Sequence, residues 1–321
     1  MKSSSVILAV LLVASIAMAQ STATQTQAPS QSGQAQGQTG TQNAAPKNAQ
    51  AQSPAGGGRV LQAKSQDELK AYQDASAKTD PAEMEAAADT FAAKYPNSEM
   101  KGALFVRAMG LYAQSNNSEK LIAAGRKAIA ADPTNPVPLV QVASVLAEAT
   151  RDTDLDREQR LNEAAKDAQD AIKNVDSGLI VPPNAPPEKV AAAKKSILMM
   201  AYDTLGMIDL NKKDYAAAEQ DLLKAADANK ATPEAVIYLR LSVAQDQLKK
   251  YPQALDSANK AVQYSPEGSA ARNYAKQQQS RVKTLMDAAA AAPAAAPAAT
   301  APPVAPNAQP STQTQPATPP H

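Results

Sequence analysis

Four acidic residues in one short segment have the spacing of a calcium-binding loop. Asp152, Asp154 and Asp156 alternate with other residues, and Glu163 occupies the twelfth position of this stretch. In an EF-hand loop these positions supply carboxylate ligands to Ca²⁺. The sixth position, however, requires Gly for a sharp turn and here holds Arg157. The stretch therefore lacks the residue that lets such a loop close around a metal ion.

A helix start explains the same acidic residues more simply. Thr153 or Asp154 can cap a helix that begins near Leu155, and acidic residues in a first turn suit the positive end of the helix dipole. We therefore predict the cap rather than a metal site, and we predict no cofactor for this chain.

Other residues that could do chemistry are scarce. His321 is the only His and the last residue, and the chain contains no Cys. Ser-His-Asp and Cys-His arrangements and the usual zinc sites are therefore absent. No Gly-rich phosphate loop is present either. We predict that the chain is not an enzyme; a carboxylate pair or a Ser-Lys pair stays open as a minor alternative.

The charge balance argues against nucleic acid as a partner. The chain has 32 Lys and Arg against 31 Asp and Glu, with two Phe and no Trp. Phosphate backbones require a concentration of basic residues, and single-stranded bases require aromatic rings for stacking. We therefore expect no nucleic-acid partner.

The first nineteen residues have the pattern of a secretory signal. Lys2 precedes an apolar run over 6–18, and small residues at Ala17 and Ala19 fit a cleavage site after Ala19. This run is shorter than the roughly 20 residues that cross a bilayer. We predict a signal peptide over 1–19, export to the periplasm or the secreted space, and no integral membrane segment in the mature chain.

Composition divides the rest of the chain into three parts. Residues 20–60 are rich in Gln, Ala, Ser, Thr and Gly and show no apolar period, so we predict a disordered linker. Residues 291–321 are rich in Ala and Pro, which favours an extended, disordered tail. The folded domain is predicted over 61–290.

Within this domain the patterns are helical, and one of them recurs. Apolar residues repeat at spacings of three and four, and no stretch alternates as a strand would. Tyr215, Ala218 and Ala225 recur 36 residues later as Tyr251, Ala254 and Ala261. A recurring helical pattern of this length predicts an all-α stack of similar units.

The two best copies resemble the tetratricopeptide repeat (TPR), a helix hairpin of about 34 residues. The copy from Met199 matches the marker positions of that family with Tyr202, Leu205, Gly206, Tyr215, Ala218 and Ala225. The copy from Ala235 matches them with Tyr238, Leu241, Tyr251, Ala254, Ala261 and Pro266. The small residues mark points where two helices cross closely, because a larger side chain there would overpack the contact.

Three weaker copies precede these two. They cover 65–98, 102–135 and a segment from Pro136 that carries an insertion around "RDTDLDREQ". A Pro-rich connection over 176–189 follows, and the sequence leaves open whether it is a hinge or a packed element. The resemblance implies an α-solenoid of about five hairpins, of the type found in exported bacterial proteins.

A capping helix is predicted to close the stack. In the segment 267–289, we expect Ala271, Tyr274, Val282 and Leu285 to face inward, with the polar residues facing water.

The resemblance also implies where a partner binds. In this family the first helix of each hairpin lines a concave groove that holds a partner peptide. The positions that match the groove here are Val140, Ser144, Asp203, Met207, Leu239, Arg240, Val243 and Asp246. An apolar groove edged by Asp203 and Asp246 suits an apolar segment that carries a positive charge. Some of these side chains could instead belong to the hairpin cores.

Two non-catalytic functions are consistent with these features. The first is a protein-protein interaction scaffold in the cell envelope or the secreted space that binds a partner peptide in the groove. The alternative is an architectural cell-wall protein in which the Ala/Pro-rich tail is a spacer and the helical stack a docking head.

Overall fold

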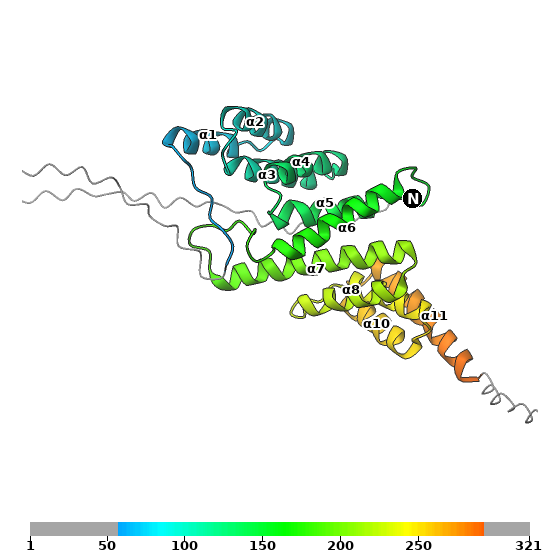
Figure 1. Ribbon diagram of the computed structural model, residues 1–321. Helices are drawn as coiled ribbons and strands as arrows, with labels where there is room; N and C mark the ends of the chain where they lie inside the picture. The colour runs from blue at the N-terminus through cyan, green and yellow to red at the C-terminus, as the bar shows by residue number, and fades with distance from the viewer. Residues whose placement is uncertain (1–56, 292–321) are drawn as a thin grey trace, which may run out of the picture.

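The computed structural model describes residues 57–291, and this part of the chain is all-α (Figure 1). The signal peptide at 1–19, most of the linker at 20–60 and all but the first residue of the tail at 291–321 lie outside the described residues. In chain order the helices are α1 (Gln66–Ser76), α2 (Pro81–Lys94), α3 (Met100–Gln114), α4 (Ser118–Ala131), α5 (Pro136–Ala149), α6 (Arg157–Asn174), α7 (Pro187–Lys212), α8 (Tyr215–Ala228), α9 (Ala235–Gln247), α10 (Tyr251–Tyr264) and α11 (Ala270–Ala291).

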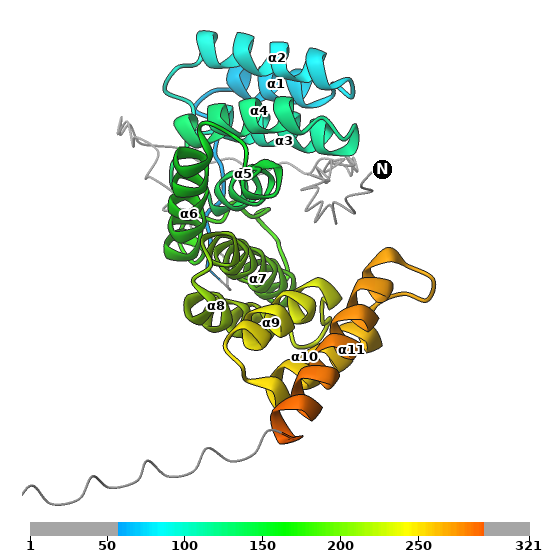
Figure 2. The same ribbon diagram turned by 90° about the vertical axis from the view of Figure 1, so that its right-hand side faces the viewer.

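Consecutive helices pair into five hairpins, from α1 with α2 to α9 with α10, and α11 packs on the last pair. The odd-numbered helices also contact one another in series, from α1 through α3, α5, α7 and α9 to α11. Figure 2 shows the stack bending, with α5, α7 and α9 on its inner side and α6 and α8 on its outer side. The predicted fold class, five hairpins with a capping helix, is confirmed.

The hairpin turns are made by residues that tolerate a left-handed backbone or that cap the next helix. Asn116, Lys213 and Lys249 have φ values of 53°, 62° and 58° and follow α3, α7 and α9. In two of these turns a side chain then caps the next helix: Asn117 accepts from a backbone N–H of α4, and Asp214 accepts from one of α8. These turns reverse the chain within two or three residues.

Small residues let the paired helices approach closely, as expected. Gly206, Ala218 and Ala225 are all buried between α7 and α8. A Cβ atom on Gly206 would lie 2.6 Å from Cγ of Leu222, which is too close for any side chain. The crossing therefore has room for hydrogen at this position and for methyl groups at the two Ala positions.

The predicted cap of α6 is wrong by about two residues. The helix begins at Arg157, and Asp156 holds the N-cap position without a side-chain hydrogen bond. Asp154 instead accepts a hydrogen bond from the backbone N–H of Arg151, at 2.8 Å. This bond stabilises the preceding turn and leaves Leu155 fully exposed.

Residues 57–60, which the sequence assigns to the linker at 20–60, pair with the connection between α6 and α7. The backbone N–H of Arg59 donates to the carbonyl of Leu179 at 2.8 Å, and the N–H of Val181 donates to the carbonyl of Arg59 at 2.9 Å. The pairing is an isolated parallel bridge. It ties the segment before α1 to the middle of the stack.

The Pro-rich connection over 176–189 is a packed element in its first half. Leu179 and Val181 are buried in the core. Gly178 lies so close to the connection between α4 and α5 that a Cβ atom there would be 1.8 Å from the carbonyl oxygen of Thr134. A connection held this tightly does not act as a hinge at this point.

The inward face of α11 differs from the predicted one. Val282 is fully buried, as expected, and Leu285 is partly buried, but Ala271 and Tyr274 are exposed and Ala275 is buried instead. Ala275 and Val282 are seven residues apart, two turns on one face, whereas Tyr274 lies about 100° away from Ala275. The polar residues on the rest of α11 face water.

We predict that Ala218→Leu lowers the free energy of unfolding by about 1–3 kcal/mol, because the buried crossing of α7 and α8 has no room for three extra carbon atoms. Chemical denaturation followed by circular dichroism measures this change. Ala216→Leu, at an exposed position of the same helix, is the control and should change stability by less than about 0.5 kcal/mol. Equal effects of the two substitutions would contradict the crossing assignment.

Candidate functional site

The inner side of the bend brings residues from three successive hairpins together. Asp203 and Met207 are one turn apart on α7, Arg240 lies on α9, and Glu148 is near the end of α5. The Arg240 guanidinium donates from Nη1 to Oδ2 of Asp203 at 2.5 Å and contacts the Met207 sulfur at 3.2 Å. Its Nη2 lies 3.9 Å from the Glu148 carboxylate. We call these four residues the inner site.

The inner site carries more negative than positive charge. Burial raises the pKa of Glu148 most, the Asp203 carboxylate raises it further, and the Arg240 guanidinium lowers it. Burial and the Asp203 carboxylate also raise the pKa of Glu234, which precedes α9. Burial and the Asp203 carboxylate thus disfavour the ionised forms of both Glu148 and Glu234.

One oxygen of the inner site lacks a partner. Oδ1 of Asp203 is buried and accepts no hydrogen bond from any described residue. The side chains of Asp203 and Arg240 are each 19% exposed, so their edges reach the surface. A buried carboxylate oxygen without a donor costs free energy, and a donor from a bound molecule would remove that cost.

The other predicted groove residues fall into two groups. Ser144, Leu239 and Val243 are partly exposed on the inner helices. Val140 is 2% exposed and packs in the core, so a partner cannot reach it in this arrangement. Asp246 is 5% exposed and accepts hydrogen bonds from Arg281 at 2.8 Å and Gln278 at 3.4 Å, both on α11. The structure thus brings Asp203, Met207 and Arg240 together, and the capping helix covers Asp246.

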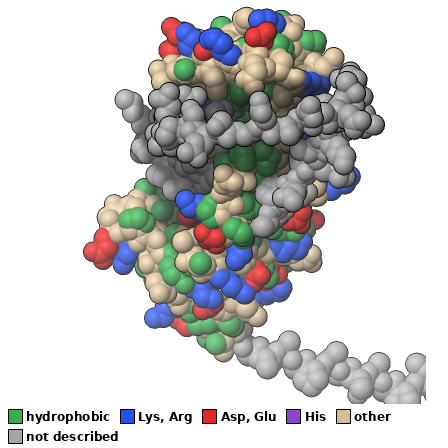
Figure 3. Space-filling view, turned by 90° about the vertical axis from the view of Figure 1, so that its left-hand side faces the viewer, with side chains coloured by type: hydrophobic (Ala, Val, Ile, Leu, Met, Phe, Trp, Pro, Cys, Tyr) green, Lys and Arg blue, Asp and Glu red, His purple; other side chains and the backbone are tan. Residues whose placement is uncertain are grey.

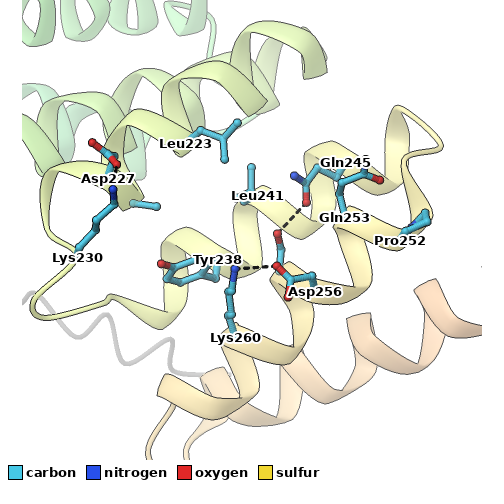
Figure 4. A pocket seen from close by; sticks show the side chains of 12 residues that line it. Leu223, Asp227, Lys230, Tyr238, Leu241, Gln245, Pro252, Gln253, Asp256 and Lys260 are labelled. Atoms are coloured by element: carbon cyan, nitrogen blue, oxygen red, sulfur yellow. Dashed lines mark hydrogen bonds and ion pairs between the residues drawn. The ribbon is translucent and has the colours of Figure 1, made fainter.

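A second surface hollow lies on the outer side, between α8 and α10 over α9 (Figure 4). It has a volume of about 640 Å³. Leu223, Tyr238, Leu241 and Pro252 supply much of its apolar lining. We call it the outer groove. The sequence patterns did not predict it, although Leu223, on an outer helix and 48% exposed, is the kind of apolar residue that signals such a surface.

The acidic stretch before α6 is neutralised by its neighbours rather than gathered around a metal site. Asp152 pairs with Arg157 at 3.2 Å, and Asp154 lies 3.8 Å from Arg160. Within residues 57–291 no three His, Cys, Asp or Glu side chains are grouped so that they could hold a metal ion. No helix in this range is both long and apolar enough to cross a bilayer. On the face shown in Figure 3, acidic and basic side chains are interspersed over the described part of the surface.

Two carboxyl groups outside the inner site have strongly raised pKa values. Burial raises the pKa of Asp167, on α6, to about 6, and the carboxylate of Glu163 adds to this effect. Burial likewise raises the pKa of Asp209, on α7, to about 6, and the carboxylate of Asp221 adds to it. Shifts of this size mark candidate acid-base groups, but burial beside other carboxylates between packed helices explains both.

Comparisons with known proteins give limited matches. No family model and no curated protein matches this chain. Two crystal structures of MamA align with it at 17% identity: one alignment covers 57% of this chain and 96% of MamA with a TM-score of 0.32, and the other covers 60% and 96% with a TM-score of 0.33. Residues 1–338 of Acl4, an assembly chaperone of RpL4, align at 10% identity over 70% of this chain and 99% of that chain, with a TM-score of 0.35. The fold described above therefore rests on this chain's own helix contacts.

We predict that Asp167→Asn stabilises the protein at pH 7 by about 1–2 kcal/mol. The folded-state pKa of about 6 lies above the ordinary value of 3.8, so ionisation of Asp167 costs stability at neutral pH. As the pH falls through 6 towards 4, Asp167 becomes protonated in the folded protein and no longer destabilises it. The stability difference between the variant and the parent therefore disappears.

Urea denaturation at pH 7 and pH 4 measures this effect. Asp287→Asn, at an exposed position of α11, is the control and should change stability little at either pH. A gain from Asp167→Asn that is equally large at pH 4 would contradict the titration of Asp167 as its cause.

Proposed function

We propose that this protein is a non-catalytic scaffold of the cell envelope or the secreted space that holds a partner peptide on the inner side of its helical stack. The observation that carries the proposal is the inner site, where partly exposed side chains from three hairpins meet and Oδ1 of Asp203 has no hydrogen-bond partner among the described residues. Stacked helix hairpins commonly present extended concave surfaces to their partners.

Apolar side chains beside the inner site support peptide binding. Val236, Leu239 and Val243 follow one face of α9 at spacings of three and four, and Val236 is 42% exposed. The opposite side of α9 is also apolar, with Ile237 and Leu241 buried in the core. An apolar stripe that is left partly exposed on the inner side fits a surface that a partner covers.

The charges indicate the chemistry of this partner. Two carboxylates, Glu148 and Asp203, lie beside the one guanidinium of Arg240 at the inner site, and the Glu234 carboxyl group is close enough to Asp203 to feel its charge. A segment with an apolar face and one Lys or Arg side chain would cover the α9 stripe and pair with the partly exposed carboxylates of Glu148 and Asp203. Export rests on the predicted signal peptide at 1–19.

Affinity capture from the exported fraction of the host tests the binding site. We predict that the full mature chain captures a discrete protein and that Met207→Lys with Val243→Lys weakens this capture at least tenfold, because both substitutions place a positive charge at an apolar position of the inner side. Quantitative mass spectrometry of the captured proteins is the measurement.

The matched control carries the same added charge on the outer side. Gln220→Lys with Gln263→Lys lies at exposed positions of α8 and α10 and should capture as the parent does. Both variants are compared at unchanged circular dichroism and melting temperature. If all three proteins capture the same set, the inner side is not the binding surface.

Export is tested on the protein made by its own host. We predict that the chain outside the cytoplasm has lost residues 1–19 and begins at Gln20, because the small residues Ala17 and Ala19 fit the cleavage site. Intact-mass measurement after fractionation gives the result, with Ala17→Lys and Ala19→Lys as the uncleaved control. An uncleaved chain found in the cytoplasm would contradict export.

A further inference from the structure

We propose that the outer groove binds this chain's own Pro-rich C-terminal segment, residues 292–321. The groove lies between α8 and α10, and its lining residues all fall within 223–260, before the capping helix α11. This intramolecular interaction is separate from partner binding at the inner site.

The outer groove offers an apolar wall with fixed shape (Figure 4). Leu223 stands 48% exposed at one side, and Leu241 forms part of the floor. The Tyr238 ring is held by Tyr264, whose ring centroid is 5.4 Å away, and by the Lys260 ammonium, 5.8 Å from its centroid. A tyrosine held in this way presents a rigid surface at little cost in side-chain entropy.

The charges at the rim of the groove are paired. Lys230 pairs with Asp227, and Lys260 pairs with Asp256 at 2.7 Å. The lining contains two acidic and two basic side chains, so the groove as a whole presents no net charge. It therefore suits an uncharged occupant, since a charged segment would lose its hydration without a free partner.

The C-terminal segment has the matching composition. Residues 292–321 contain nine of the 24 Pro residues of the chain and no Lys, Arg, Asp or Glu. Its sequence "TAPPVAP" combines one Pro pair and a further Pro with the apolar side chain of Val304. Pro-rich segments favour the extended polyproline conformation before binding, and grooves lined by aromatic rings recognise that conformation.

The position of α11 brings the segment close enough to reach the groove. Arg281 contacts Asp246 near the end of α9, and Gln279 contacts Asn259 of α10. The last ten residues of α11 extend about 15 Å further, and the chain continues from Ala291. The thirteen residues from there to Val304 span up to about 40 Å in the polyproline conformation, which is enough to pass around α10 to Pro252 at the end of the groove.

Disulfide trapping in the full chain tests this proposal, because the chain has no Cys of its own. We expect Leu223→Cys with Val304→Cys to form an intramolecular disulfide at least tenfold faster than Gln169→Cys with Val304→Cys, whose first position is exposed on α6. Non-reducing electrophoresis and peptide mapping at several protein concentrations give the rate and identify the product.

A competing peptide separates binding in the groove from random encounter. An excess of the synthetic peptide of residues 298–310 should slow trapping several-fold, and the same peptide with Ala at Pro302, Pro303 and Pro306 should not. Equal trapping rates in the two double variants would overturn the proposal. Disulfide-linked dimers whose yield rises with protein concentration would also overturn it, because the occupant would then be a second copy. No outcome depends on the partner of the inner site.

Discussion

The close approach of paired helices is the constraint on which the rest of this structure depends. Between α7 and α8 it is set by Gly206, Ala218 and Ala225, all buried, with Leu222 filling the space that they leave. A single hairpin packed in this way still exposes one apolar face, and only the next hairpin can cover it. Each pair of helices needs small residues where the two helices cross. Each pair also needs a neighbouring pair to cover its exposed apolar face, and a continuous stack results.

Stacking in turn creates the inner site, which no single hairpin contains. Glu148, Asp203 and Arg240 come from α5, α7 and α9 and meet because these helices contact one another in series. Any change in the register between hairpins would separate the guanidinium from both carboxylates. The proposed binding function is therefore a property of the arrangement of hairpins and not of a local motif.

The hairpins themselves were predictable from the sequence, because the same residue pattern occurs twice. Tyr215, Ala218 and Ala225 recur as Tyr251, Ala254 and Ala261, and both sets belong to the same kind of helix crossing. The placement of Asp203, Met207 and Arg240 on the first helices of successive hairpins followed from the same frame. Other features depend on contacts that are distant in sequence and leave no local pattern.

The pairing of Arg59 with the connection between α6 and α7 joins residues 119 positions or more apart. The inward face of α11 was predicted correctly at Val282 but wrongly at Tyr274, because Tyr274 and Ala275 are both apolar and only the packing of α11 on α10 buries Ala275. The long start of α7, twelve residues before the predicted repeat begins at Met199, was hidden by the Pro-rich sequence in front of it.

A double-mutant cycle between Asp203 and Arg240 tests most directly whether the stack assembles the inner site. Asp203→Asn, Arg240→Gln and the double variant are compared with the parent by chemical denaturation. Since the two side chains are mostly buried and joined by a charged hydrogen bond, the account predicts a favourable coupling energy of about 1–3 kcal/mol. A coupling energy of zero would contradict the contact between α7 and α9 at this position, and with it the inner site.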